Sequence, residues 1–364
     1  MITDTHPNTS FAPNWRHVGA FLGLTFGLTW LLNLGIYLRG GLNTPGIIAI
    51  LQLQMLLPAF SAILLGLFFF SESPIYYSRS AGRGRWFYYY FLLLTLIYAI
   101  GTLIIWLSPA QSTIAVLAAI PQLLAFLGLL ILVVLRFVEG RQAMARIWLA
   151  WGNWRYWLLF GLGFIIYYIL QAMLNAFSGL GGANLVLPEI PPGFTPNSLL
   201  IVGALQSVVL APILAIVIAF GEEYGWRGYL QSELFKIGRV RGVLLLGVIW
   251  GAWHWPIILM GYNYPGHPIL GLVLMALYTT GLAVVLGYAV LKSGSVLLAA
   301  YLHALNNQVV AFIAAFGFKP FDTAFSFDIG IYGIITLAIV ALLILRDPIW
   351  REKGSNLPEP DHQS

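Results

Sequence analysis

Residues 198–230 read SLLIVGALQSVVLAPILAIVIAFGEEYGWRGYL and combine the two features that decide the fold. Residues 198–220 contain no charged side chain, and a run of that length crosses the roughly 30 Å hydrocarbon core of a bilayer as a helix. The run then ends in two adjacent glutamates, Glu222 and Glu223, with Arg227 four residues on. Ionisable groups close to membrane depth are costly and indicate function. The stretch therefore predicts a membrane helix with chemistry at one end.

The composition of the whole chain agrees with a membrane protein. Of 364 residues, 60% are hydrophobic and 9% are charged, whereas a soluble domain has about 25% charged residues. Cysteine is absent, which excludes disulfides and a cysteine nucleophile. The net charge of +5 is typical of the orientation bias of membrane proteins. We therefore expect no nucleic-acid partner.

Apolar windows of similar length recur along the chain. They predict an all-α, polytopic transmembrane helix bundle of about ten spans. The candidate spans are residues 17–38, 46–70, 87–107, 114–135, 156–177, 198–220, 242–260, 268–291, 295–317 and 329–345.

Basic residues follow every second span, whereas the intervening loops hold only Arg39 and Lys319. By the positive-inside rule, this alternation places both termini in the cytoplasm of a multi-pass protein of the cell membrane. The basic residues are Arg79, Arg83, Arg85, Arg136, Arg141, Arg146, Arg155, Lys236, Arg239, Arg241, Lys292, Arg346, Arg351 and Lys353.

The candidate chemistry lies in spans six, seven and nine. Glu223 and Arg227 are four residues apart, so they share a helix face and can form an ion pair. Glu222 is turned about 100° from Glu223 and is left to face another partner. This spacing predicts that the two glutamates have different roles.

Two further pairs show the same spacing of four. Trp250 and His254 share a face, as do His303 and Asn307, whereas Asn306 is expected to point away. Pro256 is expected to loosen the helix just beyond His254.

One carboxylate, two imidazoles and an amide from three helices would suffice to activate a water and to stabilise an oxyanion. The same residues also have structural interpretations. A buried histidine or asparagine often bonds helix to helix, and a Glu–Arg pair can be purely architectural.

These blocks resemble the CPBP or Abi family of intramembrane proteases, which includes the CAAX prenyl protease 2-like, type II CAAX endopeptidases. The shared pattern is Glu-Glu-x3-Arg, then an aromatic residue and a histidine with three residues between them, then His-x3-Asn. It falls on Glu222, Glu223 and Arg227, then on Trp250 and His254, then on His303 and Asn307. Trp250 departs from the pattern, because the family usually has phenylalanine there. The resemblance covers about residues 198–315.

The resemblance implies an intramembrane endopeptidase that cleaves a membrane-associated peptide or lipid-modified protein. It implies that Glu222 and His254 activate the water, that His303 and Asn307 hold the oxyanion, and that Glu223, Arg227 and Trp250 support them. It also implies three segments: residues 1–197 as an N-terminal membrane region of about five spans, 198–317 as the catalytic core, and 318–364 as the last span and a polar tail.

Whether a metal takes part is left open by the sequence. Glu222, His254 and His303 offer a His2Glu set that could hold zinc, but HExxH is absent, and we favour a mechanism that requires no cofactor. All five aspartates lie outside the spans, which disfavours an aspartyl protease. A proton-coupled transporter, or a non-catalytic immunity or scaffold protein, remains the alternative function.

Overall fold

The computed structural model describes residues 12–71, 73, 75, 82–183, 190, 193 and 195–352. The basic residues Arg79 and Lys353, used above to orient the chain, lie outside this part. The described chain is helical almost throughout, as a membrane requires, because a helix satisfies its own backbone hydrogen bonds. The all-α class predicted from the sequence is confirmed.

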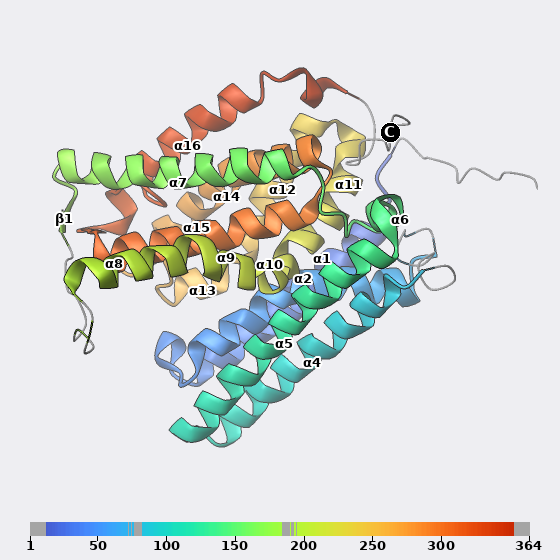
Figure 1. The fold of residues 1–364 in the computed structure, drawn as a ribbon, viewed down its shortest axis with the longest axis horizontal. Coiled ribbons are helices and arrows are strands. Elements are labelled where there is room, and N and C mark those ends of the chain that lie inside the picture. The colour runs from blue at the N-terminus through green and yellow to red at the C-terminus, as the bar shows by residue number, and fades with distance from the viewer. Residues whose placement is uncertain are drawn as a thin grey trace, which may run out of the picture.

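Among the described residues, the N-terminal half contains five long helices and the short helix α6. Helices α1, α2, α4 and α5 form one group, with contacts between successive members, and lie inclined below the rest of the molecule (Figure 1). The elements are α1 (Trp15–Leu38), α2 (Ile47–Phe68), α4 (Arg85–Leu107), α5 (Gln111–Val138), α6 (Gly140–Arg146) and α7 (Trp154–Phe177).

The C-terminal half is more broken. Helix α15 contacts α7, α10 and α14, and α16 lies on α14, so that these helices form the upper layer in Figure 1. The elements are α8 (Pro196–Leu205), α9 (Ala211–Leu214), α10 (Ile216–Glu223), α11 (Gln231–Leu234), α12 (Arg239–Trp253), α13 (Trp255–Leu259), α14 (Pro268–Ser293), α15 (Val296–Phe316) and α16 (Ile331–Ile344). Two three-residue strands, β1 (Gly181–Ala183) and β2 (Phe318–Pro320), pair antiparallel and join the ends of α7 and α15.

Seven helices in the described chain are long and apolar enough to cross a membrane. Two shorter apolar helices, Gln122–Val138 and Ile331–Ile344, fall on predicted spans four and ten. The chain is an integral membrane protein, whereas the count of about ten spans stays a prediction.

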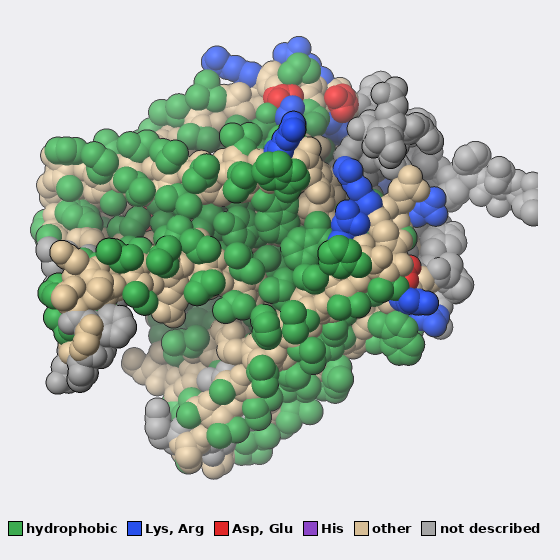
Figure 2. Space-filling model, viewed as in Figure 1, with side chains coloured by type: hydrophobic (Ala, Val, Ile, Leu, Met, Phe, Trp, Pro, Cys, Tyr) green, Lys and Arg blue, Asp and Glu red, His purple; other side chains and the backbone are tan. Residues whose placement is uncertain are grey.

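The surface separates charge from apolar side chains. Figure 2 shows hydrophobic side chains over most of the visible face, with lysines and arginines gathered at the end where the described C-terminal residues lie. A lipid-facing belt with basic residues at one end is the distribution expected of an oriented membrane protein.

A pair of glycines brings α10 against α2. A Cβ added to Gly221 would lie 2.4 Å from the carbonyl oxygen of Met55, and one added to Gly225 would lie 2.6 Å from the carbonyl carbon of Pro58. Small residues four apart let two membrane helices approach closely. Because Glu222 and Glu223 lie between these glycines, the contact sets the position of both carboxylates.

A second glycine pair does the same for α12. Cβ atoms at Gly247 and Gly251 would lie 2.4 Å from the Cα of Thr280 and 2.5 Å from the Cα of Ala276, both on α14. Trp250 lies between these two glycines and is thereby fixed against α14.

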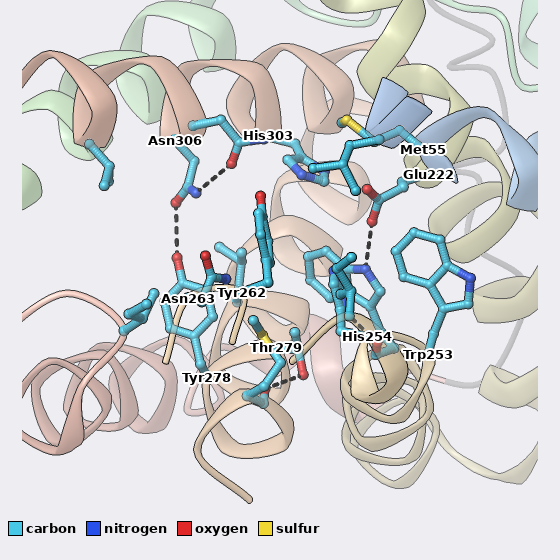
Figure 3. Close-up of a pocket in the computed structure, with 18 of the residues that line it drawn as sticks. Met55, Glu222, Trp253, His254, Tyr262, Asn263, Tyr278, Thr279, His303 and Asn306 are labelled. Atoms are coloured by element: carbon cyan, nitrogen blue, oxygen red, sulfur yellow. Dashed lines mark hydrogen bonds between the residues drawn. The ribbon is translucent and has the colours of Figure 1, made fainter. Parts of the chain in front are cut away.

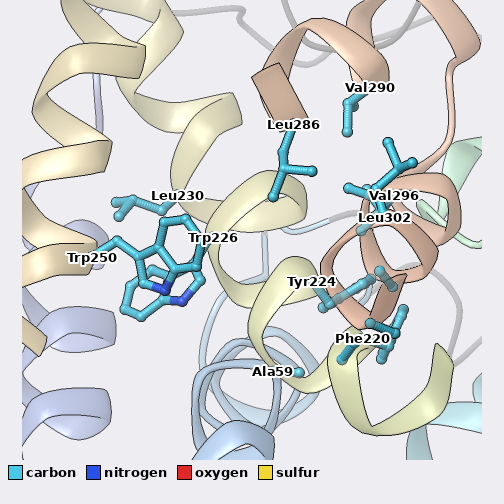
Figure 4. Packing of buried hydrophobic residues seen from close by; sticks show 14 of the residues in the cluster. Ala59, Phe220, Tyr224, Trp226, Leu230, Trp250, Leu286, Val290, Val296 and Leu302 are labelled. Atoms are coloured by element: carbon cyan, nitrogen blue, oxygen red, sulfur yellow. The ribbon is translucent and has the colours of Figure 1, made fainter. Parts of the chain in front are cut away.

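Between the two contacts the core is filled by aromatic residues. After α10 the chain continues as a π-helix over Tyr224–Leu230, an irregularity that is frequent at functional sites. Phe220 and Tyr224 pack against each other with ring centroids 4.7 Å apart, and Figure 4 shows them on the same helical ribbon as Trp226. Both rings also pack against aromatic residues of α4, which fixes the end of α10 that carries the glutamates.

Candidate active site

A cavity of about 350 Å³ lies where α10, α12 and α15 meet. Glu222, Trp250, His254, His303 and Asn307 all line it, so five of the seven residues singled out in the sequence meet around one space. Figure 3 shows Glu222 and His254 on one side of the cavity and Asn306, Asn263 and Tyr278 on the other.

Glu223 and Arg227 lie behind the cavity wall. Arg227 Nη1 donates to Glu223 Oε1 at 3.0 Å, and neither side chain has any exposed surface. The guanidinium carbon also lies 4.0 Å from the centroid of the Trp250 ring, a cation–π contact. A buried carboxylate needs such a partner, because leaving it unpaired is costly.

Glu223 also orients one of the two histidines. His303 Nδ1 lies 2.7 Å from Glu223 Oε1, and the deprotonated carboxylate accepts the hydrogen bond. The hydrogen bond fixes the ring and leaves Nε2 as the remaining functional atom of a residue that lines the cavity. Glu223 is therefore a positioning residue shared by Arg227 and His303.

Glu222 faces the cavity, as its helical position predicts. It is 3% exposed, and its Oε2 accepts a hydrogen bond of 2.7 Å from Trp250 Nε1. The indole N–H is a donor that phenylalanine lacks, so the departure from the family pattern at this position adds a contact.

His254 lies at a break in its helix. Helix α12 ends at Trp253 and α13 begins at Trp255, which confirms the loosening expected from Pro256. His254 Nδ1 lies 2.9 Å from the Trp250 carbonyl oxygen. A carbonyl only accepts, so Nδ1 carries the hydrogen and Nε2 keeps a lone pair in the neutral ring. His254 therefore has the tautomer of a proton acceptor.

Asn306 corrects the helical-spacing argument, which turned it away from the site. It lines the same cavity, and its Nδ2 donates to Asn307 Oδ1 at 3.1 Å. Its own Oδ1 accepts hydrogen bonds from the hydroxyls of Tyr168 and Tyr278. Because these bonds occupy Asn306 Oδ1 and Asn307 Oδ1, the Asn307 Nδ2 group remains available as a donor. Both adjacent asparagines therefore line the cavity.

Several lining residues escaped the sequence argument altogether. Gln54 and Met55 of α2, Tyr262 and Asn263 of the turn after α13, and Asp328 before α16 all face the cavity. Gln54 was detectable as a polar residue inside an apolar span. The position of Asp328 in a loop gave no such signal.

The geometry can be compared with known protein families. Residues 204–309 match the family model described as type II CAAX prenyl endopeptidase Rce1-like. We call this segment the Rce1-like domain, after the family that it resembles. No curated protein and no solved structure matched the chain.

The Rce1-like domain contains all seven residues of the motif. It does not close the cavity by itself, because Leu51, Gln54 and Met55 come from α2 and Asp328 from the loop before α16. Helix α2 is thus a wall of the site and contributes more than lipid-facing scaffold.

The donor set of the Rce1-like domain does not form a metal site in this structure. Among the described residues, no group of three His, Asp or Glu side chains is placed so as to hold a metal ion. His303 Nδ1 is hydrogen-bonded to Glu223, and His254 Nδ1 is hydrogen-bonded to the backbone carbonyl of Trp250. No catalytic step is therefore derived through a metal.

Proposed function

We propose that the chain is an intramembrane endopeptidase in which Glu222 and His254 activate water. The supporting observation is that a carboxylate and an imidazole with a free Nε2 face one cavity inside a membrane protein. The match to the type II CAAX prenyl endopeptidase family supports the same reaction. The substrate class is a membrane-associated protein or peptide, including lipid-modified and prenylated chains.

In the first step Glu222, assisted by His254, takes a proton from water as the oxygen attacks the scissile carbonyl carbon. The carbonyl oxygen becomes an oxyanion. Protonated His303 donates through Nε2, and Asn307 donates through Nδ2, to this oxyanion. The C–N bond then breaks as Glu222 or His254 returns the proton to the leaving amine, which balances the hydrolysis.

This mechanism needs no metal. The ion pair makes Arg227 and Glu223 neutral as a unit, so that the cavity charge rests on Glu222 and on the histidines. We place the protein in the cell membrane with both termini in the cytoplasm, in accord with the basic residues gathered at one end.

The test is cleavage of a peptide library by purified protein in liposomes. Glu222→Gln and His254→Ala are each expected to lower kcat by about 10²- to 10⁴-fold at unchanged thermal stability. Full cleavage by both variants would overturn the assignment of the site. Loss of activity on metal chelation, restored by zinc, would overturn the metal-free mechanism alone. A proton flux that the same variants abolish, without peptide cleavage, would favour the transporter.

A further inference from the structure

Asp328 is a carboxylate that the catalytic scheme does not use. It lies in the loop before α16, outside the Rce1-like domain, and lines the cavity that contains Glu222. Its side chain is half-buried, and its Oδ1 is buried without a hydrogen-bond partner among the described residues. A carboxylate oxygen in that state needs a proton or a cation.

The loop is held firmly in place. Two buried polar residues one turn apart on α7 accept from its backbone: Gln171 Oε1 from Asp328 N at 2.9 Å, and Asn175 Oδ1 from Phe327 N at 3.0 Å. The Tyr264 hydroxyl donates to the Ile329 carbonyl at 2.8 Å. These hydrogen bonds explain why Gln171 and Asn175 are polar although they are buried: they fix Asp328 at the cavity.

The backbone at Asp328 is itself constrained. Its φ is +88°, a conformation that aspartate and asparagine adopt more readily than most residues. The carbonyl oxygen of Asp328 approaches Gly333 so closely that a side chain there would collide with it. Such a residue keeps its geometry only because its surroundings hold it there.

The location of Asp328 separates it from Glu222 and His254. Its backbone N–H donates to Gln171, which is three residues from Tyr168 on α7, and the Tyr168 hydroxyl donates to Asn306 Oδ1. Asp328 therefore lies towards the Asn306 side of the cavity, and Figure 3 shows Asn306 on the side opposite Glu222 and His254. From His303 to Ala311, the lining positions of α15 extend about 12 Å along the helix.

The cavity offers this group no permanently charged cation. Its described lining includes two carboxylates and two histidines but no lysine or arginine. Burial raises the pKa of Asp328 to about 7, so the free enzyme holds the carboxylate at the edge of ionisation near neutral pH. A cation from the substrate would complete the site.

We propose that Asp328 forms a subsite for a positively charged nitrogen of the substrate, a Lys or Arg side chain or a free α-amino group. This inference rests on the proposed peptidase function and adds a substrate class to it. The carboxylate accepts a charge-assisted hydrogen bond from the cation, at a fixed position along the peptide relative to the scissile bond. Cleavage should therefore prefer peptides with one basic group at that position.

The test uses the full-length Glu222→Gln variant, which binds without turnover. Peptides differ only in a lysine moved along the chain, replaced by glutamine, or supplied as a free or acetylated N-terminus. Lysine at one position is expected to strengthen binding by about tenfold over glutamine, and Asp328→Asn is expected to remove that gain. If instead only the peptide with a free N-terminus binds more tightly than its acetylated form, the cation is the α-amino group.

Asp322→Asn is the matched control, because Asp322 lies in the same loop and pairs with His267 instead of lining the cavity. It should leave the lysine preference unchanged. Asparagine adopts a positive φ as readily as aspartate, so Asp328→Asn is expected to fold. Its melting temperature checks this expectation.

Equal binding of lysine and glutamine peptides by the Asp328 protein, or equal losses in both aspartate variants, would overturn the subsite. Because binding is measured without turnover, the subsite is judged apart from the reaction. A lysine preference in a wild-type protein that cleaves no peptide would refute the peptidase and leave the subsite standing.

Discussion

Glu223 Oε1 accepts hydrogen bonds from both Arg227 Nη1 at 3.0 Å and His303 Nδ1 at 2.7 Å, so one buried oxygen joins the ion pair to the site. The first glutamate of the pair faces the reaction space, and the second organises the histidine that faces it. This division of labour allows the two carboxylates to be tested separately.

Removal of the charge at Glu223 should slow the reaction without preventing substrate binding. In Glu223→Gln the amide oxygen can still accept from His303, but the negative charge that supports the imidazolium is lost. We expect kcat to fall by about 10²-fold with little change in KM. His267→Gln, at a position that does not line the cavity, is the control. If the role of Glu223 were purely structural, Glu223→Gln would have a lower melting temperature but an unchanged kcat per folded molecule.

The indole of Trp250 should strengthen the function of Glu222. Trp250→Phe keeps an aromatic ring over Arg227 but removes the hydrogen bond to Glu222 Oε2. A hydrogen bond to a charged group contributes about 1.5–3 kcal/mol, so a loss of about tenfold in kcat/KM is expected. Trp255→Phe, whose indole bonds a backbone carbonyl on α14, serves for comparison. Unchanged kinetics in Trp250→Phe would show that the hydrogen bond from Trp250 to Glu222 does not stabilise the transition state.

The asparagine network makes a prediction of coupling. Tyr168→Phe removes one donor to Asn306 and should lower kcat about fivefold by loosening the Asn307 amide. In an Asn307→Ala background the same change should have no further effect on kcat. If the losses in kcat of the two single variants add up in the double variant, Tyr168 does not act through Asn307.

Helix contact at the glycines should be sensitive to one methyl group. Gly225→Ala places a Cβ 2.5 Å from the Pro58 side chain and should destabilise the protein by about 1–3 kcal/mol, with loss of activity. Gly163→Ala adds a Cβ with no neighbour within 4 Å and should be neutral or slightly stabilising. Thermal unfolding in detergent measures both. Equal melting temperatures would mean that α10 and α2 can separate without cost.

Asp328 should make stability depend on pH. Burial raises its folded pKa to about 7, above the unfolded value of about 3.9, so the folded state binds the extra proton between these limits. Stability should therefore decrease as the pH rises from about 4 to 7. Asp328→Asn should be more stable than the wild type above pH 7 and similar to it at pH 4.

The groups that Asp328 acts on do not titrate in this range, since all are tyrosines with an ordinary pKa near 10. They are Tyr167, Tyr168, Tyr264 and Tyr278. The difference in melting temperature between wild type and Asp328→Asn therefore isolates the aspartate. A difference that is constant with pH would contradict the assignment.

Local spacing was sufficient to anticipate much of the site. The positions of Glu223 and Arg227 four residues apart specify an ion pair, and the proline after His254 specifies the break in α12. Apolar run length likewise anticipates the long helices. These features depend on neighbours within two turns of the same chain segment.

The remainder depends on long-range packing, which spacing does not encode. Asn306 reaches the cavity because two tyrosines from other helices hold it there, although a helical projection turns it away. Asp328 is a loop residue that becomes a wall of the site only because α7 binds its backbone. The close approach at Gly221 and Gly225 was visible as a small-residue pair, yet its partner helix was not.

The participation of α2 in the cavity has a consequence for how this protein can be divided. A fragment limited to residues 204–309 would lack Met55 and Pro58, leave the glycine face of α10 uncovered, and open the reaction space to lipid. The motif is thus not a transplantable module. Grafts, truncations and minimal versions of this protein must carry the second helix along with the sequence that does the chemistry.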